Sequence, residues 1–179
     1  KKLIVNKTNL GVAKSRNKAL KYSNGLYISF IDADDIWKTN KLYYQIHYMI
    51  KNNIDLSFTF YDIFQSNIKT KKVKKIFFKV DYTSLVKSNY IGLSTVMFSR
   101  KIISKIYFPN LKTQEDYALW LKLLREGVKF GCINKILTTW RKTKNSLSSN
   151  IFQKLLDAFK MYYFYEKKNF IFSIFSVLV

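Results

Sequence analysis

Apolar and polar positions alternate along this chain with the spacings of helices and strands, and the clearest spacing lies in its second half. Over residues 113–126 the large side chains of Tyr117, Trp120 and Leu121 recur three and four positions apart, and Gly127 follows them. This spacing puts the apolar side chains on one face of a helix, which the glycine ends. The segment therefore predicts an amphipathic helix that packs against a core.

Two earlier segments show weaker patterns of the same kind. Asn9 can cap a helix that runs to about residue 23. One side of that helix carries Val12, Arg16 and Leu20. Further on, Thr39 is a candidate cap for a second helix. The apolar stripe expected on this second helix consists of Leu42, Ile46, Met49 and Ile50.

Short apolar runs between these helices predict strands. The run LYISFID (26–32) is nearly continuous, as expected of a central strand covered on both faces. Further strands are expected over residues 3–5, 54–64, 94–99, 129–133 and 136–141. The lysine-rich stretch 65–80 predicts an exposed loop or hairpin, and 100–106 a short helix. Alternating strands and helices, with mixed elements later, predict one α/β domain with a mixed, mainly parallel sheet.

Composition and charge narrow the classes of function. The 179 residues are 48% hydrophobic, which favours a packed domain, and the net charge is +21. Such an excess favours polyanionic partners, although Lys, Ile, Asn, Phe and Tyr all have A/T-rich codons, so genome bias explains the same excess. The single cysteine and single histidine exclude a disulfide framework and paired-histidine metal sites.

Three carboxylates follow the apolar run 26–32 directly: Asp32, Asp34 and Asp35. In an open α/β sheet, ligands bind beyond the carboxyl ends of the strands. Asp32 and Asp34, in D-x-D spacing, can reach one small volume, and oxygen ligands of this kind suit Mg²⁺ or Mn²⁺ that also contacts substrate phosphates. The alternative is a helix-entry turn that Asp35 merely caps.

A second acidic pair, Glu115 and Asp116, opens the predicted helix over 113–126. A capping box explains the pair without any function, with Thr113 as the cap and Asp116 at the third helical position. A functional interpretation requires that these carboxylates face the same cleft as Asp32 and Asp34, which spacing cannot establish.

Four segments together resemble the inverting family 2 glycosyltransferases of the GT-A fold. They are NLGVAKSRNKAL (9–20), SNGLYISFIDADDIW (23–37), QEDYALWLKLLREG (114–127) and TWRKTKNSLSS (139–149). Their order and separations match the family's pattern, and the resemblance covers about residues 3–149. It implies metal-dependent, inverting transfer of a hexosyl or N-acetylhexosaminyl group from a nucleotide sugar, with a UDP-sugar expected. The implied acceptor is a glycan or lipid-linked hydroxyl in surface polysaccharide synthesis.

The resemblance also implies roles for individual residues. Asp32 would hold the donor's ribose or the water shell of the metal, and Asp34 would coordinate Mn²⁺ or Mg²⁺. Asp116, or alternatively Glu115, would be the general base. The residues implied on the nucleotide-sugar side are Asn9, Gly11, Arg16 and, in a segment that folds over the diphosphate, Arg141.

The resemblance leaves two features of the chain to interpret. The family's first strand and its nucleotide-binding turn would precede residue 1, so residues 1–149 are expected to be an N-terminally truncated GT-A-like domain. Residues 150–179 are expected to form a C-terminal helix and an apolar tail, with possible contact to the inner face of the cytoplasmic membrane. The alternatives are a non-catalytic basic module for anionic membranes or nucleic acid, the latter disfavoured by scarce Arg, and a degenerate partner subunit.

Overall fold

The structure is a computed structural model that describes residues 2–65, 68–70, 80–142 and 150–178. In the first half of the chain the elements are α1 (Val12–Tyr22), β1 (Tyr27–Ser29), β2 (Ile36–Trp37), α2 (Lys41–Asn52), β3 (Leu56–Gln65), β4 (Ile68–Thr70) and α3 (Tyr82–Leu85). They are followed by the 3₁₀ turns η1 (Leu93–Thr95) and η2 (Arg100–Lys105), which flank β5 (Met97–Ser99), and then by α4 (Glu115–Arg125) and β6 (Phe130–Arg141). The C-terminal elements are α5 (Ile151–Lys160), the π-helical turn η4 (Met161–Tyr165) and α6 (Phe170–Leu178).

The strands form one mixed sheet in the order β1-β5-β3-β6-β2, and β4 pairs with β3 as a hairpin. The two longest described strands, β3 and β6, run parallel, because the chain between them crosses back through α3 and α4. The other four described pairs are antiparallel. The predicted α/β fold with a mixed sheet is confirmed, but parallel pairing does not dominate it.

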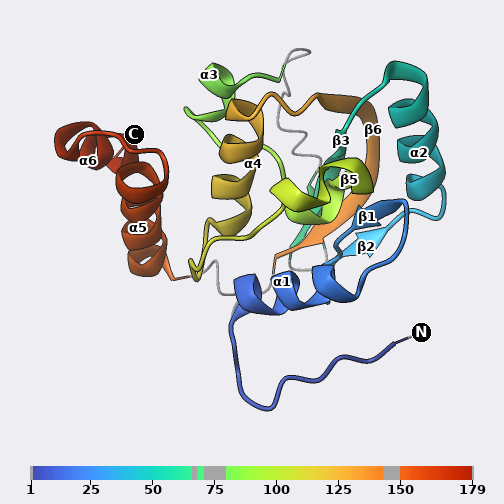
Figure 1. The fold of residues 1–179 in the computed structure, drawn as a ribbon, viewed down its shortest axis with the longest axis horizontal. Helices are drawn as coiled ribbons and strands as arrows, with labels where there is room; N and C mark the ends of the chain where they lie inside the picture. The colour runs from blue at the N-terminus through green and yellow to red at the C-terminus, as the bar shows by residue number, and fades with distance from the viewer. Residues whose placement is uncertain (1, 66–67, 71–79, 143–149, 179) are drawn as a thin grey trace.

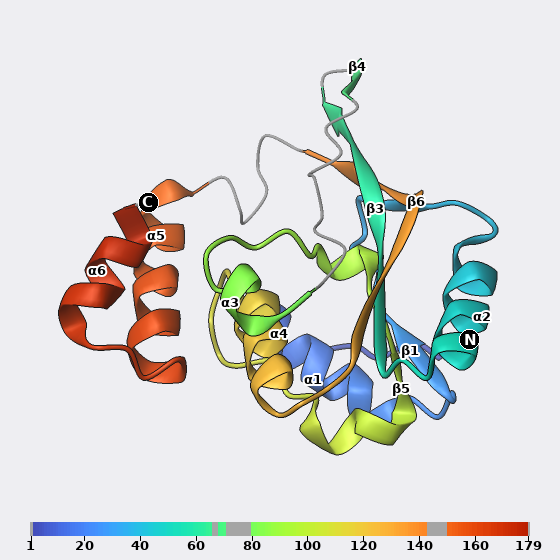
Figure 2. The same ribbon diagram turned by 90° about the horizontal axis from the view of Figure 1, so that it is seen from above.

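Helices cover both faces of this sheet (Figures 1 and 2). α2 packs on one face, and α4 lies on the other with α1 and α3 beside it, while α5 and α6 lie outside α4. Phe58 of β3 and Trp120 and Leu121 of α4 have no exposed surface and lie in the core. α4 is buried on more than one side because it is enclosed between the sheet and the C-terminal helices.

The strand predictions hold for the long strands and fail near the N-terminus. β3 agrees with the prediction for 54–64, and the two strands expected over 129–133 and 136–141 are one strand, β6, whose register against β3 shifts on either side of Phe60. Residues 3–5 form no strand. β1 is three residues long and lies at an edge of the sheet formed by the described strands, so the prediction of a central strand was wrong.

The buried face of α2 also differs from the prediction. Its buried residues are Lys41, Gln45 and Met49, whereas the predicted stripe residues Leu42 and Ile50 are exposed. The Lys41 ammonium group donates to Gln45 Oε1 at 2.6 Å and lies 4.1 Å from the centre of the Trp37 ring. These contacts stabilise the ammonium group of Lys41 inside the molecule, where a charged side chain is not expected. Burial nevertheless lowers the pKa of Lys41 to about 7.

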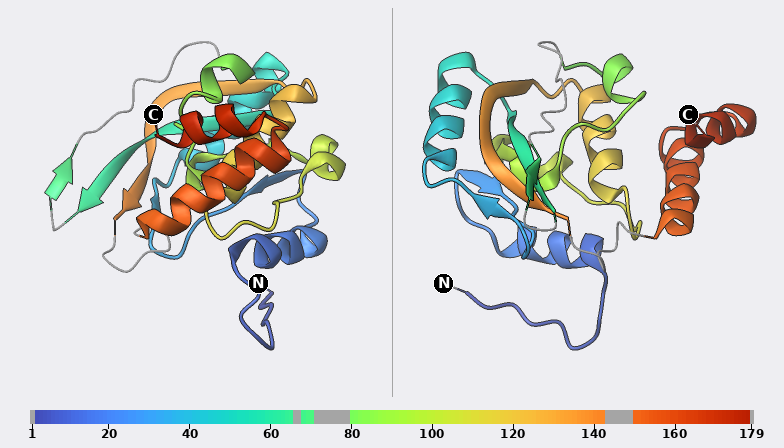
Figure 3. Two further views of the ribbon diagram at one scale, coloured as in Figure 1. Left: turned by 90° about the vertical axis from the view of Figure 1, so that its left-hand side faces the viewer. Right: turned by 180° about the vertical axis from the view of Figure 1, so that it is seen from behind.

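The C-terminal segment folds back on itself. The C-terminal helix expected within residues 150–179 ends in the η4 turn, and α6, in the expected apolar tail, then packs against α5 (Figure 3). Polar contacts join this pair to α4: Asp157 accepts hydrogen bonds from the Thr113 backbone and hydroxyl, and Glu166 pairs with Arg125. Among the described helices, none combines the length and hydropathy needed to cross a bilayer.

Candidate active site

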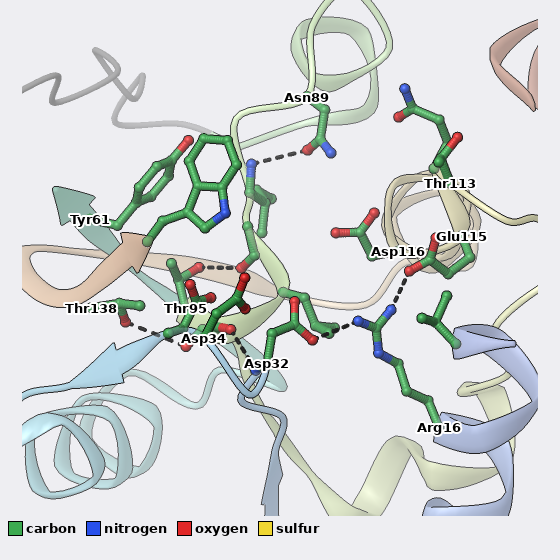
Figure 4. Close-up of a pocket in the computed structure, with 18 of the residues that line it drawn as sticks. Arg16, Asp32, Asp34, Tyr61, Asn89, Thr95, Thr113, Glu115, Asp116 and Thr138 are labelled. Atoms are coloured by element: carbon green, nitrogen blue, oxygen red, sulfur yellow. Dashed lines mark hydrogen bonds and ion pairs between the residues drawn. The ribbon is translucent and has the colours of Figure 1, made fainter. Parts of the chain in front are cut away.

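A cavity of about 440 Å³ opens beyond the end of β6, between the first turn of α4 and the turn that follows β1. It draws side chains from segments far apart in the sequence (Figure 4). Both predicted acidic groups line it, Asp32 and Asp34 from the turn and Glu115 and Asp116 from α4. The condition set for a functional interpretation, that the two groups face one cleft, is therefore met.

Arg16 joins the two acidic groups (Figure 4). Its Nη2 atom donates to Asp32 Oδ1 at 2.7 Å, and its Nη1 atom donates to Glu115 Oε1. The Arg16 side chain is 14% exposed, so it is a structural part of the cavity wall. Burial lowers the pKa of the guanidinium, but the charges of Asp32 and Glu115 outweigh burial and raise it, so Arg16 is a permanent cation here.

The aspartate turn is held from two sides. The Asp35 N–H donates to the Asp32 carbonyl at 3.0 Å, and the Asp32 N–H donates to Ser94 Oγ at 3.1 Å. Arg141 at the end of β6 donates its backbone N–H to Asp35 Oδ1 at 3.1 Å and its Nε to the Asp34 carbonyl. These bonds fix the direction in which the Asp32 and Asp34 carboxylates leave the turn. Burial raises the pKa of Asp35.

The acidic pair of α4 does not form the predicted capping box. Gln114 precedes the helix with φ 66°, and its side chain makes no capping hydrogen bond. The Thr113 hydroxyl donates to Asp157 at 3.0 Å instead, because α5 offers a buried carboxylate at that position. The capping interpretation of Thr113 and Asp116 was therefore wrong.

Glu115 and Asp116 have different surroundings. The Glu115 side chain is buried and paired with Arg16; burial raises its pKa, although Arg16 opposes the shift. Burial, together with the neighbouring Glu115 charge, raises the pKa of Asp116 to about 7. Asp116 lines the cavity and retains some exposed surface. A carboxylate with such a pKa can exchange a proton near neutral pH.

The turn residues fit a divalent cation that shares its coordination with a ligand. Among the residues that the structure describes, no cluster of three or more His, Cys, Asp or Glu side chains is arranged to hold a metal by itself. Mg²⁺ and Mn²⁺ need fewer protein ligands, because they bind through one or two carboxylates when phosphate oxygens complete the coordination. Asp34 and Asp32, two positions apart on one fixed turn at the cavity, supply that number.

Three other predicted residues lie elsewhere. Asn9 and Gly11 are exposed and outside the cavity, where Asn9 Oδ1 accepts the Gly11 N–H at 2.9 Å and Gly11 adopts φ 76°. They form the turn before α1, and that helix contributes Val12 and Arg16 to the wall. Arg141, expected in a segment that folds over the diphosphate, is part of β6 and braces the aspartate turn. Residues 143–149, which follow it in the same sequence motif, lie outside the described residues.

Sequence reasoning missed several residues of the cavity wall. The missed polar and aromatic lining residues include Tyr61, Asn89, Ser94, Lys112, Trp140 and Lys154. Ser94 and Trp140 lie inside segments already assigned as strands, where a side chain that faces a cavity cannot be told from one that faces the core. Lys154 reaches the cavity only because α5 packs beside α4, and no local pattern encodes that contact.

Comparisons with known proteins identify the family of the chain. The sequence profile of Glycosyl transferase family 2 matches residues 1–111. The chain is 40% identical over 157 residues to the Escherichia coli UDP-Glc:alpha-D-GlcNAc-diphosphoundecaprenol beta-1,3-glucosyltransferase WfgD, covering 86% of this chain and 60% of the relative. It is 37% identical over 143 residues to the Bacillus subtilis putative teichuronic acid biosynthesis glycosyltransferase TuaG, covering 79% of this chain and 57% of that relative. The chain thus spans about three-fifths of the length of these curated relatives.

The fold has solved counterparts as well. The crystal structure of S. aureus TarS 1-349 in complex with UDP-GlcNAc superimposes with a TM-score of 0.63 at 19% identity, covering 91% of this chain and 50% of that one. At this identity the likeness establishes the fold. Taken with the profile and the curated relatives, it shows that the chain belongs to glycosyltransferase family 2.

Proposed function

We propose that the protein transfers a sugar from a nucleoside-diphosphate sugar to a hydroxyl group of a glycan or lipid-linked acceptor in surface polysaccharide synthesis. One observation carries the proposal: a metal-type aspartate pair and a separate acidic pair face one cavity, and Arg16 bridges them. The names of the relatives support it, since WfgD is a UDP-glucose enzyme that acts on a lipid diphosphate and TuaG is assigned to teichuronic acid biosynthesis.

The donor occupies the side of the cavity formed by the aspartate turn. Asp34 and Asp32 would hold Mn²⁺ or Mg²⁺, which supplies positive charge to the diphosphate when it is bound. Arg16 adds a fixed cation 2.7 Å from Asp32. Negative charge builds on the diphosphate as it leaves, so cations held in advance stabilise the transition state more than the ground state.

Asp116 is the general base in this proposal. Glu115 already pairs with Arg16, whereas Asp116 faces the cavity and its pKa of about 7 suits proton transfer at neutral pH. The acceptor hydroxyl oxygen bonds to the anomeric carbon while its proton passes to the Asp116 carboxylate. The bond from the anomeric carbon to the diphosphate oxygen breaks, and its electron pair leaves with the nucleotide. A single displacement of this kind inverts the anomeric centre.

Calorimetry with UDP-glucose and Mn²⁺, followed by measurement of UDP release with acceptor, tests the two roles separately. Asp34→Ala is expected to lose the metal-dependent part of donor binding. Asp116→Asn is expected to bind the donor normally and to lose turnover. Glu126→Gln is the matched control, because Glu126 is an exposed acid whose ion pair with Lys122 lies on the far end of α4. Metal-dependent binding that survives Asp34→Ala would refute the donor assignment.

A further inference from the structure

The C-terminal helices expose large apolar side chains over much of their outer surface. Exposed fractions there reach 72% at Phe152, 63% at Phe164 and 65% at Phe175. Other exposed apolar residues of this surface are Leu156, Phe170 and Ile171. Soluble domains seldom leave so many neighbouring apolar residues in water, and such surfaces mark an interaction site. We name the outer side of α5, η4 and α6 the C-terminal face (Figure 3).

Aromatic contacts hold the C-terminal face together. The rings of Phe159 and Tyr163 stack with centroids 5.6 Å apart, and the rings of Phe159 and Phe170 are nearly perpendicular, also with centroids 5.6 Å apart. Tyr163 also contacts Phe164 at 5.0 Å. These rings join α5 and α6 without burying them, since Tyr163, Phe164 and Phe170 remain exposed. The face is therefore a fixed apolar surface.

The charges around this face have one sign. The acidic residues of the segment 150–178 are Asp157 and Glu166, and both are buried against the rest of the molecule. Asp157 accepts hydrogen bonds from Thr113, and Glu166 pairs with Arg125. The lysines of the same segment, Lys154, Lys160, Lys167 and Lys168, retain exposed surface. The C-terminal face thus offers apolar side chains and positive charge to a partner, with no exposed carboxylate among its described residues.

We propose that the C-terminal face docks on the surface of an anionic lipid bilayer. Aromatic side chains enter the boundary between headgroups and acyl chains, and lysines contact anionic headgroups. A second copy of the chain is a poorer partner, because two such faces would bring lysines together without carboxylates to pair with them. The helices lie on the bilayer, since none of the described ones is long enough to span it.

This face lies beside the candidate active site. Lys154 of α5 lines the cavity of the candidate active site. A smaller cavity of about 220 Å³ lies between α4 and the C-terminal helices, and Asn89, Gln114 and Lys154 line both cavities. Docking would thus hold the catalytic cavity close to the headgroups, where a lipid-linked acceptor would be found. This last step rests on the proposed function, whereas docking itself does not.

Vesicle flotation tests the docking. Vesicles of phosphatidylcholine alone are compared with vesicles that contain equal parts of phosphatidylcholine and phosphatidylglycerol. The protein is expected to float with the anionic vesicles and to be released from them at high salt. Phe164→Ser combined with Phe175→Ser, and separately Lys160→Glu combined with Lys167→Glu, are each expected to weaken binding by about tenfold or more.

Matched controls are available on α2. Tyr43 and Ile50 are exposed to a similar degree as Phe164 and Phe175, so Tyr43→Ser combined with Ile50→Ser is the control for the loss of apolar side chains. Lys51 is also exposed, and Lys51→Glu is the control for charge reversal on another surface. Both controls are expected to bind like the unchanged protein. Thermal melting verifies that each variant folds, and Phe152→Ser replaces the double variant if that one does not.

Three results would overturn the proposal. One is the absence of flotation with anionic vesicles, and another is an equal loss of binding in the α2 controls. The third is a dimer in sedimentation that the Phe164 and Phe175 substitutions dissociate, which would make the C-terminal face an interface between copies. Failure of glycosyl transfer with intact flotation would leave the docking in place and refute only the proposed activity.

Discussion

Replacing Asp116 by Asn removes the proposed general base with little change in side-chain volume. Because the pKa of Asp116 is raised to about 7, about half of the molecules carry its carboxylate at pH 7 and about a tenth at pH 6. The transfer rate of the unchanged protein is therefore expected to rise about tenfold per pH unit below pH 7 and to level off above it. Asn cannot accept the proton, so the rate should fall by about 10²–10⁴-fold and lose this pH dependence.

The assay measures UDP release at saturating UDP-glucose and Mn²⁺ from pH 5.5 to pH 8.5, with Glu126→Gln as the control. Calorimetry at pH 8 checks that Asp116→Asn still binds the donor. A variant that keeps near-normal transfer, or the same rise in rate with pH, would place the base at another residue. Glu115→Gln is then the next variant to measure, because Glu115 lines the same cavity.

The same substitution has an effect on stability whose sign follows from the raised pKa. The folded state binds the Asp116 proton more tightly than the unfolded chain, so the free energy of unfolding falls as pH rises from about 4 to about 7. One pKa unit corresponds to about 1.4 kcal/mol. A shift of about three units corresponds to about 4 kcal/mol, and since Asn stays neutral, we expect Asp116→Asn to be more stable than the unchanged protein at pH 8 by up to about that amount. Urea unfolding measures this difference, and a less stable variant would assign Asp116 a structural role.

Two further substitutions test the electrostatics of the core and the cavity. Arg16→Met leaves Asp32 and Glu115 without their shared cation, so we expect the free energy of unfolding to fall by about 3 kcal/mol and donor affinity to fall with it; unchanged urea unfolding would contradict this. Lys41 has a pKa lowered to about 7, so the unfolded chain binds its proton more tightly and stability should rise between about pH 7 and pH 10. Lys41→Met should remove that rise, which urea unfolding at pH 7 and pH 9.5 measures. If the free energy of unfolding changes equally with pH in both proteins, the lowered pKa of Lys41 is refuted.

The sequence was most informative where the chemistry is local. The D-x-D spacing behind an apolar run predicted that Asp32 and Asp34 follow the end of a strand. The helical pattern over 113–126 predicted that Glu115 and Asp116 lie in the first turn of a helix. Together with the family resemblance, these segments predicted the fold and part of the cavity lining, namely Arg16, Asp32, Asp34, Glu115 and Asp116. The roles of these residues remain predictions that the experiments above address.

Features that depend on contacts between distant segments could not be predicted. The apolar stripe predicted for the second helix did not include Lys41 and Gln45, yet both are buried. The Gln45 amide donates to the Thr95 carbonyl at 3.0 Å and anchors the η1 turn in the interior. Thr113 has the sequence of a helix cap, but a carboxylate 44 positions later competes for its hydroxyl. In both cases tertiary hydrogen bonds override the local preference.

The bond between Thr113 and Asp157 ties the start of α4 to α5. Asp157 accepts both the backbone N–H and the hydroxyl of Thr113, at 2.9 and 3.0 Å, two residues before Glu115. A displacement of α5 would thus pull on the residues that orient Glu115 and Asp116. The proposed general base, Asp116, is thus linked through Thr113 to the outermost helices of the molecule, so a force applied to those helices from outside would be transmitted to the candidate active site.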